Sequence, residues 1–189
     1  MQRVLSTAIF TVALVMTTVM VPSSAEAFFR LGVEARWAPV AVERMTEQGE
    51  AVEARRELES TGIGARALFG FTHFSIGAKT NLTHHVFTDG ELNYSQFDVN
   101  LHVRSGMPLT RLAFFGEVGP SMALDIGDVG FNASVGLEVD VLGWPLVDMN
   151  LGLAAQYSHV SIATGPSTDR INQGLRAILV LGIDIALVE

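Results

Sequence analysis

The residues best placed for chemistry in this sequence are His159 and Ser161, which are two positions apart. Residues with this spacing lie on the same face of a strand, so the imidazole could accept a proton from the serine hydroxyl. An acid would have to orient the ring. The competing interpretation, which the sequence favours, is that both side chains are polar residues at the end of a strand.

Other kinds of chemistry find no support in the sequence. It contains no nucleotide-binding loop, zinc-ligand cluster or nucleophile elbow. His84 and His85 are adjacent and would point to opposite faces of a strand, so they cannot easily share a metal. The net charge of −8, from 12 Lys and Arg against 20 Asp and Glu, argues against nucleic acid as a partner. We therefore expect neither a metal nor a cofactor.

The elements that would position these residues are β-strands. Apolar residues alternate with small or charged ones through most of the second half of the chain, most clearly from Val129 to Val141 and from Leu175 to Leu187. A period of two indicates a strand with one apolar face. These runs exceed the usual soluble strand of about 5–6 residues and match the roughly 9–11 residues of a tilted membrane-spanning strand.

The alternation predicts an all-β fold, an eight-stranded antiparallel up-and-down transmembrane β-barrel. The turn near Thr72 is inferred only from a one-residue change of phase, which indicates either a turn or a bulge. A turn is favoured, because a bulge would leave seven strands and bacterial barrels have even numbers. The strands are expected at about Phe28–Ala38, Thr61–Phe71, Phe74–His84, Glu91–Arg104, Leu109–Leu124, Val129–Leu142, Leu146–Ile162 and Ile171–Val188.

The connections between these strands alternate in length. The two longest, Pro39–Ser60 and Ala163–Arg170, fall on the outer side if the chain starts in the periplasm, and this is the usual pattern in bacterial outer-membrane barrels. Within the first of them, Val40–Leu58 is rich in Ala, Glu and Arg, and its apolar residues are spaced loosely at helical intervals. We expect a short helical or flexible first outer loop.

The polar phase of the strands carries a balanced set of charges. A barrel of eight strands is narrow enough for side chains to fill, and charges confined there must be paired. Equal numbers of cations and anions therefore predict a plugged, salt-bridged interior rather than a charge-selective pore. The expected interior charges are Arg30, Arg36, Arg66, Lys79, Arg104, Arg111 and Arg176 against Glu34, Asp98, Glu117, Glu138, Asp140, Asp148 and Asp184, with His102 and Gln156 in the same phase.

Aromatic residues cluster near the predicted strand ends, as in the interfacial girdles of membrane barrels. In a soluble barrel the polarity would be reversed, with the apolar residues inside. The polar phase holds Gly, Ser and opposite charges rather than the Lys and Glu of a solvated exterior, which favours the membrane interpretation. The girdle residues are expected to be Trp37, Phe71, Phe74, Trp144 and Tyr157.

The beginning of the chain predicts export. Arg3 precedes the apolar stretch Ala8–Val21, and Ala25-Glu26-Ala27 has the form of a signal-peptidase site. We expect a signal peptide over residues 1–27 and a barrel domain over residues 28–189. The chain has no cysteine, so no disulfide holds this fold.

The export signal, eight alternating strands and charged interior together resemble the small bacterial outer-membrane β-barrels typified by the transmembrane domain of outer membrane protein A. The resemblance implies a monomeric protein of the cell outer membrane, without enzymatic activity, in contact with lipid and lipopolysaccharide and folded by the barrel-assembly machinery. Such proteins usually end in an aromatic residue, whereas this sequence ends Leu187-Val188-Glu189.

Two alternatives to a non-enzymatic barrel remain at this point. The segment Tyr157–Leu175 is similar to the His-x-Ser strand of lipid A deacylases, which implies an esterase using His159 and Ser161. The family's Asn after the Ser is Ile162 here, and Asp169 or Asn172 would have to substitute for the family's Glu on the next strand. The second alternative is a soluble periplasmic lipocalin-like binder, in which the apolar phase would enclose a ligand.

Overall fold

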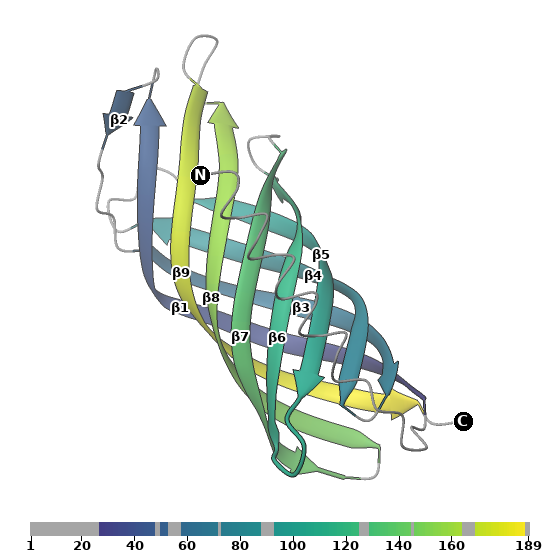
Figure 1. The fold of residues 1–189 in the computed structure, drawn as a ribbon. Coiled ribbons are helices and arrows are strands. Elements are labelled where there is room, and N and C mark those ends of the chain that lie inside the picture. The colour runs from purple at the N-terminus through teal and green to yellow at the C-terminus, as the bar shows by residue number, and fades with distance from the viewer. Residues whose placement is uncertain are drawn as a thin grey trace, which may run out of the picture.

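The computed structural model describes residues 27–47, 50–52, 58–71, 73–87, 93–124, 129–144, 146–163 and 169–187. Each strand pairs antiparallel with the next, and pairing of β1 with β9 closes the sheet (Figure 1). β2 lies only against the outer end of β1, so the barrel itself has eight strands in up-and-down order. The strands are β1 Phe28–Glu47, β2 Glu50–Val52, β3 Leu58–Phe71, β4 Phe74–Phe87, β5 Tyr94–Gly106, β6 Leu112–Ala123, β7 Val129–Gly143, β8 Val147–Ala163 and β9 Asp169–Leu187.

The connection near Thr72 is a turn and not a bulge. Phe71 is the register partner of Phe74, and the pairing of β3 with β4 continues without interruption to Leu58 and Phe87. Only two residues separate the paired phenylalanines, which accounts for the one-residue change of phase in the sequence. The prediction of eight strands is therefore confirmed.

The first outer connection differs from its prediction. Instead of a helix or flexible loop, β1 continues to Glu47 and stays paired with β9 as far as Arg170, while Glu50–Val52 folds back as β2. Pairing with β9 satisfies the backbone of this segment, and such tertiary pairing overrides weak helical spacing. Residues 48–49 and 53–57 lie outside the described part of the chain.

One flank of the barrel is taller than the rest. β1 leaves β3 at the pair Ala38–Ser60, where its register with β9 shifts next to Pro39, which has no N–H to donate. Beyond this point β8, β9, β1 and β2 continue as a ribbon that rises from the rim (Figure 1). Apart from β2, the strands have 12 to 20 residues. A tilted strand needs roughly 9–11 residues to cross a bilayer, so the strands of the tall flank are longer than a bilayer requires.

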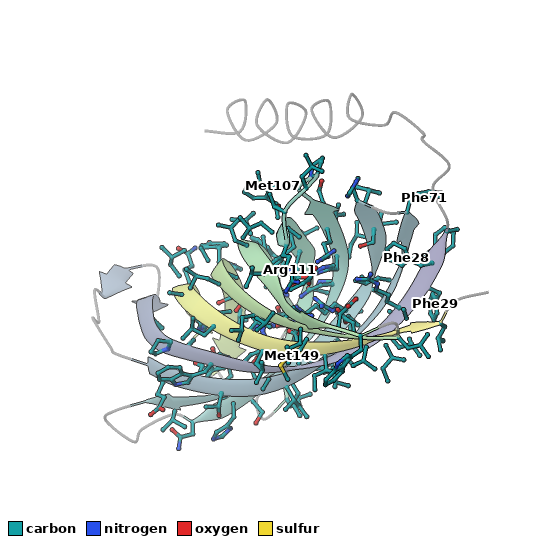
Figure 2. All side chains as sticks on the ribbon, turned by 90° about the horizontal axis from the view of Figure 1, so that it is seen from below. Phe28, Phe29, Phe71, Met107, Arg111 and Met149 are labelled. Carbon is teal, nitrogen blue, oxygen red and sulfur yellow. The ribbon has the colours of Figure 1, made fainter. Side chains whose placement is uncertain are left out.

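The two faces of the wall have opposite polarity. On β7, the side chain of Val135 is 67% exposed on the outer face, whereas Asn132, three positions earlier on the same strand, is 0% exposed inside the barrel. Figure 2, a view of all side chains, shows nitrogen and oxygen atoms gathered within the ring of strands and carbon projecting outward. An apolar exterior around a polar interior contradicts the soluble lipocalin-like alternative, which requires the reverse arrangement.

Candidate functional site

Near the periplasmic end, the interior of the barrel is crossed by ion pairs from several strands. Arg66 on β3 donates from Nε to Asp184 Oδ1 on β9 at 2.8 Å, and from Nη1 to Glu138 Oε2 on β7 at 3.1 Å. Its Nη2 also contacts Asp184. Arg104 on β5 pairs with the same Glu138 and donates to both oxygens of Asp140 at 3.1 Å. Two guanidinium groups and three carboxylates thus connect four strands across the lumen.

The periplasmic mouth holds the remaining charges of this end. Arg30 Nη1 lies 3.2 Å from Asp148 Oδ2, and both side chains are 21% exposed. Arg111 departs from its predicted interior position, because β6 begins only at Leu112 and Arg111 belongs to the preceding turn. It is exposed at the mouth, and its Nη1 donates to the backbone oxygen of Val141 at 3.4 Å (Figure 2).

A second ion-pair cluster lies at mid-height and joins residues of β1, β4, β5 and β6. Lys79 Nζ is 2.8 Å from Glu34 Oε1 and 2.5 Å from Glu117 Oε1. His102 Nδ1 lies 3.1 Å from the same Glu117 oxygen, and Arg36 Nε lies 3.5 Å from Glu34 Oε1. All five side chains are almost completely buried. A buried charge without a partner is very costly, so these pairs hold one another in place.

Toward the outer end, hydrogen bonds that involve neutral side chains replace ion pairs between the described residues. Asp98 is completely buried and accepts from Ser121 Oγ at 2.6 Å and from Gln96 Nε2 at 2.7 Å. Asn132 Nδ2 donates to Asn100 Oδ1 and to Ser121 Oγ, both at 2.9 Å. This amide layer was not predicted from the sequence, because Asn, Gln and Ser are uncharged and the interior positions were identified mainly from charged residues.

Arg176 and Gln156 occupy the same outer half of the lumen. Arg176 Nη1 donates to Ser158 Oγ at 2.6 Å, and its Nη2 donates to the Tyr94 hydroxyl at 3.4 Å. Gln156 is the register partner of Arg176 and is also buried. Apart from Arg111, the charged residues expected inside therefore point into the barrel.

One part of the interior is apolar, which the sequence analysis missed. Phe115 packs with Ala38, Ala154, Ile178 and Val180 in a buried cluster. The Phe115 ring also stacks on His102 with centroids 5.6 Å apart and lies 5.7 Å from Lys79 Nζ. The available signal was Ile178 and Val180, two apolar residues in the otherwise polar phase of β9. The phenylalanine ring fills space between the mid-height ion pairs and the small residues of β8 and β9.

The lumen contains a serine–histidine contact that does not involve the candidate residues His159 and Ser161. Ser60 Oγ and His85 Nδ1 are 2.7 Å apart, and the His85 ring packs against Tyr94 with centroids 4.6 Å apart. All three side chains are 1% exposed. We interpret this contact as a hydrogen bond that satisfies two buried polar groups, because no substrate reaches atoms so enclosed.

Of the two candidate catalytic residues, the structure describes the side chain of His159, which lies on the outward face of β8. His159 stacks on Phe131 with ring centroids 5.5 Å apart, and its Nδ1 lies 3.3 Å from Gln173 Nε2. Among the described residues, the hydrogen-bonding neighbour of the ring is therefore the amide of Gln173. The side chains of Ser161, Asp169 and Asn172 lie outside the described part of the structure.

Two belts of aromatic residues surround the exterior. Phe71, Phe74 and Trp144 lie at the periplasmic turns, whereas Trp37 and Tyr157 lie toward the outer end. The Trp37 indole donates to Glu59 Oε1 at 3.4 Å, so its polar edge meets a charged side chain at this level. Phe29, Phe114 and Phe131 are further exposed members of the belts that were not predicted from the sequence.

The spacing of the belts fits a bilayer. Phe29 and Trp37 both point outward on β1, and positions 29 to 37 span nine residues. Such a length suits a tilted strand that crosses the hydrocarbon core. The outward side chains between the belts are Val, Leu, Ile, Ala, Phe, Met and Thr, without charge.

The described residues contain neither a helix that could cross a membrane nor a side-chain cluster that could hold a metal ion. No helix in these segments is both long enough and apolar enough to cross a membrane. The same segments contain no cluster of three or more His, Cys, Asp or Glu side chains arranged to hold a metal ion.

Comparison with known proteins gives similarity of structure alone. No family model and no curated protein matches the chain. The solid-state NMR structure of the outer membrane protein AlkL in lipid bilayers superimposes with a TM-score of 0.57 at 11% identity, covering 90% of this chain and 95% of that one. Neisserial surface protein A gives a TM-score of 0.47 at 9% identity, covering 83% and 96%, and Ail of Yersinia pestis 0.42 at 11%, covering 82% and 99%.

The fold and its polarity define the class of the protein. It is a small eight-stranded β-barrel of the bacterial outer-membrane type, with an apolar wall between two aromatic belts. A closed barrel satisfies every backbone group of its wall and can therefore face hydrocarbon. The chain is accordingly an integral protein of the outer membrane.

Proposed function

We propose that this protein is a non-enzymatic outer-membrane barrel with a plugged lumen, whose role is structural or consists of contacts made at the cell surface. The observation that carries the proposal is the series of paired side chains that runs from the half-buried Arg30 and Asp148 at the periplasmic mouth, through the buried Arg66 and Lys79, to the buried Asp98 near the outer end. Side chains that neutralise and fill a narrow lumen leave no continuous path for solutes.

The tall flank supports a role at the surface. β8, β9, β1 and β2 extend beyond the outer belt, so this ribbon stands outside the hydrocarbon. Its neighbours there would be lipopolysaccharide headgroups or another surface molecule. The barrel would act as a monomer folded by the barrel-assembly machinery, because its sheet is closed and leaves no edge within the membrane.

Single-channel recording in planar lipid bilayers tests the plugged lumen. The mature protein, with folding verified by a shift in gel mobility on boiling, should give no stable current steps at either polarity. The same preparation should bind to the bilayer, which a separate flotation assay checks. Reproducible steps from the wild-type protein would refute the proposal and indicate a pore.

A second candidate function is a lipid A deacylase. What favours it is the outward position of His159 beside Phe131 at the outer belt, within reach of outer-leaflet lipid. In this case the wild type would release a fatty acid from lipid A, and His159→Ala would abolish release while the folded gel mobility is kept. Absence of release by the folded wild type removes this candidate.

A further inference from the structure

The outer wall of the barrel is not evenly packed at mid-membrane. Two grooves of about 550 Å³ and about 480 Å³ lie on its lipid-facing side, and Ala35 and Leu181 line both of them. Ala35 on β1 and Leu181 on β9 are register partners. The two grooves therefore meet at the seam where the barrel closes, and we call them together the seam trough.

The seam trough follows a single row of paired residues around the wall. From the Ala35–Leu181 pair the row runs one way through Ile63 to Phe97 near the outer end of β5. In the other direction it continues across β8 and β7 to Leu112 at the periplasmic end of β6. Because barrel strands are tilted, such a row crosses the membrane obliquely.

Small and large side chains shape this trough. Ala35 presents only a methyl group, whereas Ile63 beside it is 65% exposed and Leu153 across the second groove is 55% exposed. The trough lies between the aromatic belts, and Trp37 of the outer belt lines the second groove. Its opening therefore faces the hydrocarbon of the bilayer.

We propose that the seam trough binds one acyl chain of a glycerophospholipid. A chain of methylenes can follow a long and largely apolar course, and it loses no hydrogen bonds by doing so. The wall of a second copy of this barrel is convex, so only single side chains of that copy could enter the trough, whereas an acyl chain can follow its length. A phospholipid has two chains on a flexible glycerol and can lay one of them in the trough, whereas lipid A holds its several chains as a bundle on a rigid disaccharide. The proposal depends on the bilayer position of the wall and not on the plugged lumen.

Substitution at Ala35 provides the test. Ala35→Leu would place a larger side chain where the two grooves meet, and Ala78→Leu makes the same change at an exposed position of β4 outside the trough. Each protein is folded into vesicles of dioleoyl-phosphatidylethanolamine and dioleoyl-phosphatidylglycerol, extracted in mild detergent and examined by native mass spectrometry. The wild type and Ala78→Leu should retain one phospholipid, and Ala35→Leu should lose it several-fold.

A fluorescence measurement gives a second readout that does not need extraction. The chain has two tryptophans, so Trp144→Phe leaves Trp37 as the only one. Phospholipid brominated on its acyl chains should quench Trp37 saturably at low mole fraction, and Ala35→Leu should reduce that component to the level of random contact. Equal retention and equal quenching in the Ala35→Leu and Ala78→Leu proteins would overturn the proposal, as would a trough occupied by a second copy in a stable dimer.

Discussion

At the scale of single residues, Arg66 has the most demanding position in the molecule. It is 4% exposed and pairs with Asp184 on β9, two strands away around the wall, and with Glu138 on β7, which lies across the lumen. Its planar guanidinium serves both carboxylates at once, which a lysine ammonium does not do with the same geometry. Without Arg66, Asp184 would keep only the Asn150 amide as a described donor, at 3.0 Å.

Replacing Arg66 by Ala should therefore destabilise the barrel strongly. Removing one partner of a buried ion pair leaves an uncompensated charge, at a cost of about 3–5 kcal/mol. Equilibrium unfolding in urea from lipid vesicles measures the change in free energy. Arg111→Ala is the control, because Arg111 is exposed and an exposed substitution should stay within about 0.5 kcal/mol. Equal stability of the two variants would contradict the proposed role of the interior network.

At the scale of elements, the pairing of β3 with β4 depends on a residue without a side chain. A Cβ atom at Gly77 would lie 1.9 Å from the backbone oxygen of Ala67 and 2.9 Å from Leu68 Cα. Backbone atoms of a paired strand cannot move aside as a flexible side chain does. The close approach of the two strands at this point thus requires glycine.

Gly77→Ala should lower the fraction of protein that folds. The added methyl group would push β3 and β4 apart next to their tight turn. Gel mobility without boiling measures the folded fraction, and Gly106→Ala is a matched control, since its Cβ would meet nothing closer than 3.8 Å. If both variants fold as well as the wild type, the strands do not approach as closely as described.

Also at this scale, the sequence predicted the strands better than it predicted the contents of the lumen. Alternation located eight strands because each wall residue faces either lipid or lumen, and a period of two follows directly. It failed at Val40–Glu47, where pairing with the partner strand β9 decides the structure and local spacing does not. It also failed at Arg111, since parity cannot indicate where a strand begins.

The partners inside the lumen were beyond the reach of sequence reasoning. Equal charge predicts that ions pair but not which ones, because Arg66 and Asp184 are 118 positions apart and meet only when the barrel closes. The apolar cluster around Phe115 was missed for a related reason. Its members lie on four strands and only their convergence makes them a cluster.

At the scale of the whole molecule, the apolar outer face of the barrel must be in contact with hydrocarbon. Val135 and Val129 lie on the same outward face of β7 and are 67% and 66% exposed. Val135 lies between the belts, whereas Val129 begins the strand at its outer end, beyond Phe131 of the outer belt. Val135→Arg should cost about 2–4 kcal/mol in vesicles, and Val129→Arg about 0–1 kcal/mol. Folding titrations in phospholipid measure both, and equal small costs would indicate a face in contact with water.

The most direct test of the central claim uses the absence of cysteine from the chain. Single cysteines introduced one at a time from position 132 to 138 on β7 are spin-labelled in lipid vesicles, and collisions with oxygen and with a water-soluble nickel complex are measured. The account predicts that labels at 133, 135 and 137 collide with oxygen but not with nickel, and that labels at 132, 134 and 138 are shielded from both. Nickel accessibility at the odd positions would contradict it, because that face would then be in water.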